Sequence, residues 1–313
     1  MNTPTNTDRV AVVLMAYGTP RSVDEIEPYY TDIRRGRPPT PELLTELIER
    51  YAAIGGISPL AERTEAQQTA LQGALDEIAP GRYHVALGLK HADPKIETTV
   101  DDLASQGFRR LVGVVLAPHD SAYSIGQYLG RMDTAAEPHG LTTSGVRSWA
   151  TEPAFVEFIS NDLAERLAAA PEHRRVLFTA HSLPERILQG GDPYPDELRA
   201  TAEAVAARLG LVEGTDWEIA WQSAGRTPEP WIGPDVLERI DQIATERDTT
   251  PVDGVIVSAV GFVSDHLEVL YDLDIEAAQF AAERGLAFDR TACVNDDPQV
   301  MAALARRVHA AGV

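Results

Sequence analysis

Cysteine is almost absent from this chain of 313 residues, because Cys293 is the only one. A single thiol cannot form an intramolecular disulfide, and it cannot supply an all-cysteine metal or iron–sulfur site. This cysteine usage is typical of a reducing cytoplasm, which is the compartment we expect. The sequence also lacks a Gly-x-Gly-x-x-Gly or Walker motif, so nothing in it supports nucleotide binding.

Basic residues are scarce relative to acidic ones: 27 Lys and Arg stand against 48 Asp and Glu, which gives a net charge of −21. Nucleic acid and anionic membrane surfaces both need a basic footprint on their partners, so we expect neither as a partner. No apolar run approaches the roughly 20 residues of a membrane span. The opening sequence MNTPTNTDRV has neither the basic nor the apolar region of a signal peptide. We therefore expect a soluble protein.

Short apolar and β-branched runs, each bounded by turn residues, recur along the chain. They predict buried parallel strands at 10–18, 83–89, 110–118, 176–182, 217–223 and 254–262. Amphipathic stretches between them predict helices at 62–78, 95–106, 153–170, 195–209 and 235–247. This alternation is typical of an α/β protein with right-handed crossovers. Because it runs through both halves, it indicates two similar domains that meet near residues 140–152, with a C-terminal helix at 297–311.

Polar residues that directly follow the predicted strands are the first candidates for a site, because ligands of parallel sheets bind at the carboxyl ends of strands. They are Tyr17, Lys90, His91, His119, His181, Gln222, Ser223 and the run from Asp265 to Glu268. His181 follows an apolar strand and precedes a proline-bearing turn, where burial favours a neutral imidazole that accepts a proton or binds a metal. The alternative for a lone histidine is a loop cap without a chemical role.

Three carboxylates in the segment GFVSDHLEVLYDLDIE (261–276) would stand at i, i+4 and i+8 of one helix: Glu268, Asp272 and Glu276. Like charges at that spacing repel each other. A carboxylate row in a cleft attracts divalent cations, and oxygen ligands without thiols suit a hydrated metal in transit. The alternative interpretation is a solvated helix face.

Two further segments gather groups that bind anions. YYTDIRRGRPP (29–39) and RYAAIGGISPL (50–60) contain Arg34, Arg35, Arg37, Arg50, Tyr51 and Ser58. Guanidinium groups match carboxylates and phosphates in a bidentate manner, although a solvated basic turn is the alternative. Together with the histidine and the carboxylates, these residues indicate a flat apolar ligand that has carboxylate arms and receives a metal at its centre.

Eight motifs resemble, in order and spacing, those of the ferrochelatase family, and most of all those of its short bacterial members that make coproheme. They are LMAYGTP, YYTDIRRGRPP, RYAAIGGISPLAERTEAQ, GLKHADPKIE, VVLAPHDSAYSIGQY, TAHSLPERI with GDPYPDEL, WQSAGRTPEPWIGPDV and VGFVSDHLEVLYDLDIE. The resemblance covers about residues 10 to 311.

The resemblance implies an α/β fold of two similar Rossmann-type, chelatase-like domains, each with a mainly parallel sheet flanked by helices, and a porphyrin cleft between them. The domains expected are 8–145 and 146–296, with a C-terminal helix at 297–313 that packs back on the first. The implied activity is that of a lyase of heme (porphyrin) biosynthesis, which inserts Fe²⁺ into coproporphyrin III and releases two protons. The alternatives are a protoporphyrin IX ferrochelatase and a non-catalytic porphyrin- or heme-binding protein.

Carried over position by position, the resemblance makes His181 and Glu268 the catalytic pair and the first two of four metal ligands, followed by Asp272 and Glu276. The porphyrin-binding residues that it implies are Tyr17, Arg34, Arg50, Tyr51, Ser58, Lys90, His91 and Tyr128. Fe²⁺ is then a substrate, and we expect no cofactor. A [2Fe–2S] cluster, which some relatives bind through four cysteines, is not expected. We expect a cytoplasmic monomer whose partners are coproporphyrin III and Fe²⁺.

Overall fold

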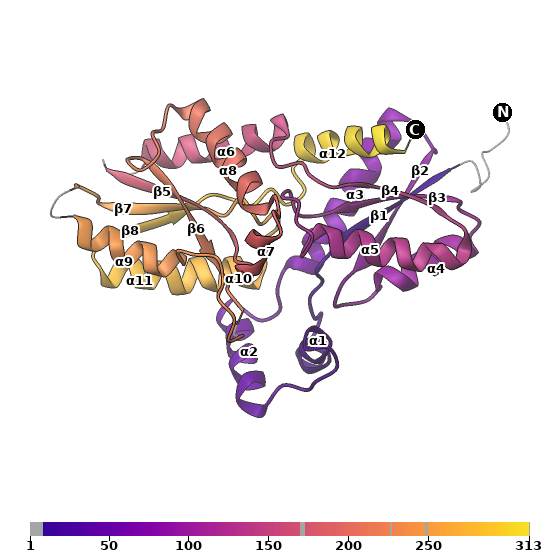
Figure 1. Ribbon diagram of the computed structural model, residues 1–313, viewed down its shortest axis with the longest axis horizontal. Helices are drawn as coiled ribbons and strands as arrows, with labels where there is room; N and C mark the ends of the chain where they lie inside the picture. The colour runs from indigo at the N-terminus through magenta and orange to yellow at the C-terminus, as the bar shows by residue number, and fades with distance from the viewer. Residues whose placement is uncertain (1–8, 170–172, 226, 248–249, 313) are drawn as a thin grey trace. The chain divides into compact units, whose positions relative to one another are not determined.

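The structure is a computed structural model that describes residues 9–169, 173–225, 227–247 and 250–312 (Figure 1). The chain divides into two compact units. The described parts of Met1–Pro118, Ser124–Trp149 and Asn295–Val313 form unit 1, and those of His119–Tyr123 and Ala150–Val294 form unit 2. The domain boundary predicted at 145/146 does not anticipate the short passage of residues 119–123 into unit 2. Residues 8, 170 and 313, at which predicted elements begin or end, lie outside the described residues.

Unit 1 contains a parallel sheet of strand order β2-β1-β3-β4. The strands are β1 (Val10–Ala16), β2 (Tyr83–Leu89), β3 (Arg110–Val115) and β4 (Thr142–Val146). Every residue of the central strand β1, VAVVLMA, is buried. An uninterrupted apolar strand of this kind is what a parallel sheet with both faces covered requires.

Helices cover both faces of this sheet. One face carries α3 (Leu60–Ile78) and α12 (Pro298–Ala311), which pack on each other, and the other carries α4 (Ile96–Ser105) and α5 (Ile125–Ala136) (Figure 1). The remaining helices of unit 1 are η1 (Val23–Glu25), α1 (Ile26–Ile33), α2 (Pro41–Ala53) and η2 (Glu137–His139). α2 begins where the hydroxyl of Thr40 accepts a hydrogen bond from the amide of Leu43 and where Pro41 occupies the first helical position.

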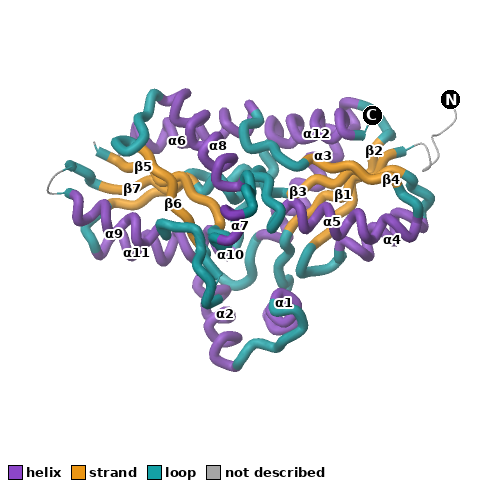
Figure 2. Tube along the Cα trace, viewed as in Figure 1, coloured by secondary structure: helices purple, strands orange, loops and turns teal. Residues whose placement is uncertain are grey.

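Unit 2 repeats the same topology, with the parallel order β6-β5-β7-β8. Its strands are β5 (Arg174–His181), β6 (Trp217–Gln222), β7 (Gly254–Ser258) and β8 (Ala287–Arg290). Figure 2 shows strands flanked by helices in each unit. One face of the second sheet carries α6 (Pro153–Ala169) and α8 (Tyr194–Leu209), and the other carries α9 (Val236–Glu246) and α11 (Ala278–Glu283). Shorter helices of unit 2 are α7 (Arg186–Gln189), α10 (Leu267–Leu270) and the π-helix η3 (Asp272–Ala277).

The order of both sheets reverses beside the first strand, so that β1 pairs with both β2 and β3, and β5 pairs with both β6 and β7. Such a reversal is the switch point at which open α/β sheets bind ligands. In unit 2 the loop after β7 passes directly over β5 at Gly261, where an added Cβ would stand 2.4 Å from the Cβ of Ala180. Only glycine fits this close approach, which brings the segment after β7 against the end of β5.

The two-domain α/β fold predicted from the sequence is confirmed, and all six predicted strands are present. The edge strands β4 and β8 were not predicted, because TTSGV and AFDR are short, partly exposed and rich in polar residues. The helices α1, α2 and α5 were not predicted either. The cleft expected between the domains stays a prediction. No helix of the described residues is long and apolar enough to cross a membrane.

Candidate functional site

The side chain of His181 has one nitrogen engaged and the other directed at a carboxylate. His181 ends β5, and its Nδ1 lies 2.5 Å from the carbonyl oxygen of Ser182. A carbonyl oxygen can only accept a hydrogen bond, so Nδ1 carries the hydrogen and the neutral ring has its lone pair on Nε2. Nε2 lies 3.7 Å from Oε1 of Glu268. The structure therefore brings together the two residues predicted to be catalytic.

Glu268 lies between two imidazoles. Its second oxygen, Oε2, is 3.6 Å from Nε2 of His266. Nδ1 of His266 lies 3.0 Å from the carbonyl oxygen of Ser264, so this ring also has its lone pair on Nε2 when neutral. The side chains of His181 and Glu268 are 34% and 37% exposed, so the pair can reach solvent. An accessible carboxylate with two basic nitrogens can accept protons or bind a cation.

His266 belongs to the strand-end run from Asp265 to Glu268, but the predicted catalytic and metal-binding set omitted it. It caps α10 in an extended conformation, two residues before Glu268. The signal was present in the sequence as the pair of His and Glu in DHLE. The helical spacing that was used to select Glu268, Asp272 and Glu276 ignores a residue at i−2, because such a residue points elsewhere on a helix. An extended cap residue does not follow that spacing.

Asp272 is buried, 7% exposed, and accepts a hydrogen bond of 2.6 Å from the hydroxyl of Ser223. Ser223 directly follows β6, and its φ of 58° lies in the left-handed region that residues other than glycine rarely occupy. Backbone strain of this kind is often found at functional sites. The strand-end position of Ser223 and the carboxylate of Asp272 are thus joined in unit 2.

The expectation that the three carboxylates lie on one regular α-helix is wrong. α10 ends at Leu270, and a π-helix follows in which the amide of Glu276 donates to the carbonyl of Tyr271, five residues earlier. An α-helix turns by about 100° per residue, and the wider π turn by roughly 80°. The steps from Glu268 to Asp272 and from Asp272 to Glu276 therefore sum to about two full turns. In ideal geometry, four α-helical steps followed by four π-helical steps bring the last residue back to the direction of the first, whereas eight α-helical steps would rotate it by about 80°.

The four predicted metal ligands do not form a preassembled cluster. Within the described residues there is no group of three or more His, Cys, Asp or Glu side chains arranged to hold a metal ion. His181 and Glu268 form a pair, Asp272 is bonded to Ser223, and Glu276 is exposed. The assignment of all four as ligands of the iron stays a prediction.

In unit 1 the structure gathers three strand-end residues at the carboxyl edge of the sheet. The ring centroids of Tyr17 and His91 are 4.5 Å apart. Nζ of Lys90 lies 6.0 Å from the centroid of the Tyr17 ring and 5.1 Å from that of Tyr128. Burial, followed by the nearby charge of Arg131, lowers the pKa of Lys90. A cation partly withdrawn from water among aromatic rings is suited to bind a carboxylate.

Asp32 fixes the orientation of His91. Its Oδ2 lies 2.8 Å from Nδ1 of His91 and 3.0 Å from Nζ of Lys95. Burial raises the pKa of Asp32, but the hydrogen bonds from His91 and Lys95 outweigh this effect, so the pKa is lowered overall. Burial lowers the pKa of His91 more than Asp32 raises it, which favours the neutral imidazole.

The remaining predicted porphyrin-binding residues lie on or near the helices α1, α2 and α3. Arg34 follows α1, and its Cζ stands 5.6 Å from the ring centroid of Tyr30. Arg50 and Tyr51 belong to α2, which packs on α1. The side chain of Tyr51 is 3% exposed, and Ser58, 5% exposed, accepts a hydrogen bond from the amide of Leu60 at the start of α3. The roles of these residues stay predictions.

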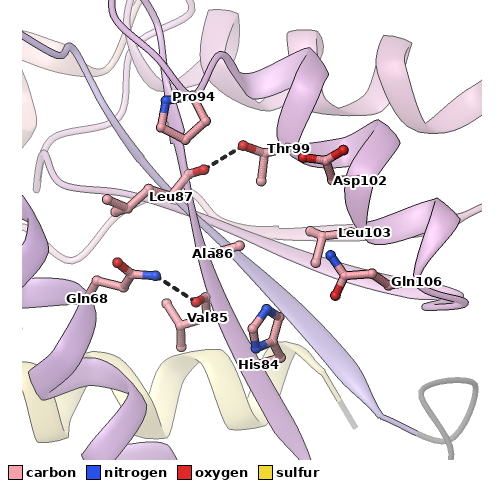
Figure 3. A pocket seen from close by; sticks show the side chains of 10 residues that line it. All are labelled: Gln68, His84, Val85, Ala86, Leu87, Pro94, Thr99, Asp102, Leu103 and Gln106. Carbon is pink, nitrogen blue, oxygen red and sulfur yellow. Dashed lines mark hydrogen bonds between the residues drawn. The ribbon is translucent and has the colours of Figure 1, made fainter.

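A pocket of about 300 Å³ in unit 1 contains none of the predicted site residues. Figure 3 shows its lining: Gln68, His84, Val85, Ala86, Leu87, Pro94, Thr99, Asp102, Leu103 and Gln106. It lies along the free edge of β2, where the side chains of Gln68 and Thr99 donate to the carbonyls of Val85 and Leu87 at 2.8 and 2.6 Å. These bonds satisfy edge carbonyls that would otherwise recruit another strand. We interpret the pocket as the closed edge of the sheet.

Fold and site together define a class: an α/β protein of two Rossmann-type units that carries an imidazole–carboxylate pair at the switch point of its second sheet. The family model described as Ferrochelatase matches residues 9–311. The chain belongs to the ferrochelatase family.

Curated relatives are similar over nearly their whole lengths. A protein of Herpetosiphon aurantiacus named ferrochelatase is 43% identical over 296 residues, which cover 93% of this chain and 95% of the relative. The coproporphyrin III ferrochelatase of Halalkalibacterium halodurans is 42% identical over 301 residues, 95% of each chain. That of Geobacillus kaustophilus is 43% identical over 300 residues, which cover 94% of this chain and 93% of the relative.

Two solved structures share the fold. The sirohydrochlorin chelatase SirB of Bacillus subtilis subspecies spizizenii, in complex with cobalt, superposes with a TM-score of 0.57 at 11% identity and covers 97% of this chain and 95% of its own. SirB of Bacillus subtilis with Fe³⁺ has a TM-score of 0.56 at 14% identity, and the match covers 97% of this chain and 96% of the SirB chain. At these identities the likeness concerns the fold alone.

Proposed function

We propose that this protein inserts Fe²⁺ into coproporphyrin III, forming coproheme and releasing two protons. The observation that carries the proposal is the pair of His181 and Glu268, with the lone pair of Nε2 facing a carboxylate at 3.7 Å, in a chain of the ferrochelatase family. The curated relatives named coproporphyrin III ferrochelatase, at 42–43% identity, support the choice of porphyrin.

The reaction must remove two protons from the central nitrogens of the porphyrin and the water shell from the iron. Nε2 of His181 is the acceptor for the porphyrin protons, because its other nitrogen is already bonded to the Ser182 carbonyl. Glu268 stabilises the imidazolium that forms, and it binds the incoming cation or passes protons toward His266. Asp272 and Glu276 continue this route as partners of the cation. Their mutual repulsion is offset when a cation or a shared proton lies among them.

Substrate binding supplies the distortion that the chemistry needs. A bent macrocycle tilts a nitrogen lone pair out of its plane, and the strain is offset by binding energy from the distant carboxylate arms. Arg34, Arg50 and Lys90 are the cations that would bind these arms, with Tyr17, Tyr51, Ser58, His91 and Tyr128 as further porphyrin contacts. The whole chain carries a net charge of −21, which repels an anionic porphyrin. Within a Debye length of about 8 Å, the attraction of these local cations therefore has to exceed that repulsion.

We further propose that the enzyme is a cytoplasmic monomer that needs no cofactor and binds no nucleic acid. A four-cysteine [2Fe–2S] cluster within one chain is incompatible with a sequence that has one cysteine.

Anaerobic incubation with coproporphyrin III and Fe²⁺ tests the function. The absorption bands of the free porphyrin should be replaced by those of the iron porphyrin at a rate that depends on protein concentration. Protoporphyrin IX is assayed in parallel, and we expect a lower kcat/KM because it has two carboxylate arms instead of four. An equal or higher kcat/KM with protoporphyrin IX would favour the other ring as substrate. Binding of either porphyrin without metal insertion would identify a carrier and contradict the proposal.

A further inference from the structure

Arg290 connects the two ends of the segment that carries the candidate metal-side residues. Its Nε and Nη2 bind the two carboxylate oxygens of Asp274 at 2.5 and 2.9 Å, and Nη2 also lies 3.2 Å from Oδ1 of Asp265. Asp265 directly precedes His266, and Asp274 lies within the π-helix, between Asp272 and Glu276. One guanidinium thus joins Asp265 to Asp274, and the stretch between them contains His266, Glu268 and Asp272.

The backbone that carries Arg290 is itself firmly held. Arg290 ends β8, which pairs with β7. On one side of it, the carboxylate of Asp289 binds Nη1 of Arg166 at 2.6 Å. On the other side, the amide of Ala292 donates to Asp162 at 2.9 Å. Both Asp162 and Arg166 belong to α6, so Arg290 extends from a frame formed by the sheet and a packed helix.

The carboxylates that Arg290 binds belong to a segment that includes the π-helix Asp272–Ala277, and a π-helix is less favourable than an α-helix. π-helices are rare and usually restricted to single turns, so tertiary contacts have to compensate for the less favourable geometry. Asp272 is bonded to Ser223 at 2.6 Å, and Asp274 is bonded to Arg290. The π turn is therefore fixed from two sides by side chains that follow β6 and end β8.

The guanidinium of Arg290 keeps its charge. Burial lowers the pKa of Arg290, but the hydrogen bond and charge of Asp274 outweigh that effect and raise the pKa overall. The other ionisable groups beside it are Asp265 and the thiol of Cys293, whose pKa is raised by burial, so that it stays a neutral thiol. A bidentate pair of guanidinium and carboxylate fixes direction as well as distance, and a lysine ammonium cannot reproduce this geometry.

We propose that Arg290, acting through Asp265 and Asp274, is a positioning residue for metal insertion. It holds the π-helix in the geometry that presents His266, Glu268 and the carboxylates after it to the metal. The role rests on the proposed function. Arg290 and Asp274 themselves need not touch porphyrin or iron, so a defect at either residue should appear in the rate of insertion and not in porphyrin binding.

The test compares Asp274→Asn and Arg290→Lys with the matched variant Arg284→Lys. Arg284 lies in the same unit and binds Asp241 through Nε at 2.6 Å, but this carboxylate belongs to α9 and not to the π-helix. Asp274 is 38% exposed, so replacing it with its neutral isostere leaves the core untouched. We expect kcat for Fe²⁺ insertion into coproporphyrin III to fall about tenfold to a hundredfold in both test variants, as small displacements of reacting groups commonly cost. The KM for porphyrin and the thermal midpoint should match those of Arg284→Lys.

The double variant Asp274→Asn/Arg290→Lys should be no slower than the slower single variant, because both changes break the same pair. A kcat within twofold of wild type in Asp274→Asn, or an equal loss in Arg284→Lys, would overturn the role of Arg290. So would a fall in kcat/KM that comes entirely from KM. A wild-type protein that binds porphyrin without inserting iron would overturn the proposed function itself, so the two failures are distinguishable.

Discussion

His181 and Glu268 meet because β5 and β7 are neighbours in a parallel sheet. His181 is the last residue of β5, Glu268 lies in the first helix after β7, and Nε2 and Oε1 stand 3.7 Å apart. Gly261 permits the loop from β7 to α10 to cross directly over Ala180. The pair is thus fixed by strand order and by one glycine, and it lies where open α/β sheets place their ligands.

Replacing His181 with Ala should abolish measurable iron insertion, because it removes the nitrogen that accepts the porphyrin protons. Removal of a general base typically costs about 10²–10⁴ in rate. The dissociation constant for coproporphyrin III, measured by fluorescence quenching, should stay within about threefold of wild type, because a lost van der Waals contact contributes little. His139→Ala is the matched control, since Nε2 of His139 lies 2.6 Å from Oδ1 of the exposed Asp101 in unit 1. A simultaneous loss of porphyrin binding would indicate a damaged fold and contradict a role limited to catalysis.

Replacing Glu268 with Gln retains the size of the side chain and removes its charge. We expect kcat to fall about a hundredfold, because His181 loses the carboxylate that stabilises its protonated form. The KM for Fe²⁺ should also rise if the carboxylate binds the incoming cation. Steady-state kinetics with varied Fe²⁺ measure both quantities. Activity equal to wild type would remove Glu268 from the mechanism.

The sequence predicts the sheets well where burial is complete. Strands such as VAVVLMA are apolar throughout, and a short apolar run bounded by turn residues is typical of a strand that is buried on both faces. The criterion of an apolar run does not detect β8, because the sequence AFDR contains two charged residues. Pairing with β7 holds this strand in the sheet, and its Arg290 binds Asp274. The polar edge strand owes its place to tertiary contacts, which a local pattern does not contain.

In the candidate site, too, some features follow from the sequence pattern and others depend on tertiary contacts. The rule that ligands bind at strand ends selects His181 and the run from Asp265 to Glu268 as candidates, and the family resemblance pairs His181 with Glu268. The π-helix does not follow from any spacing, because Asp272 and Glu276 at i and i+4 are equally compatible with a regular helix. What selects the wider turn is visible only in three dimensions, in the contacts of Asp272 with Ser223 and of Asp274 with Arg290.

Replacing Arg34 with Ala should weaken the binding of coproporphyrin III about tenfold, which corresponds to one lost charge-assisted contact. The dissociation constant should also become less sensitive to salt than that of wild type, since one screened charge pair is missing. Titrations at low and high ionic strength measure both effects. Arg208→Ala is the control, because Arg208 lies in unit 2 and is only loosely paired with Glu157 at 4.0 Å. An unchanged affinity would exclude Arg34 from the porphyrin site.

The buried imidazole of His119 should make the fold sensitive to acid. His119 is 1% exposed, its Nε2 lies 2.9 Å from the hydroxyl of Thr201, and burial lowers its pKa from 6.5 to about 3. Below pH 6.5 His119 binds a proton in the unfolded chain but stays neutral in the folded chain. The free energy of unfolding is therefore highest above this pH and falls as the pH decreases toward 3. The loss is about 1.4 kcal/mol per pH unit.

Urea unfolding at pH 6.5 and 5 measures this loss. The free energy of unfolding should decrease between the two pH values by about 2 kcal/mol more in wild type than in His119→Gln. His139→Gln, which changes an exposed histidine, should behave like wild type, and an equal decrease in wild type and His119→Gln would show that His119 can be protonated in the folded state.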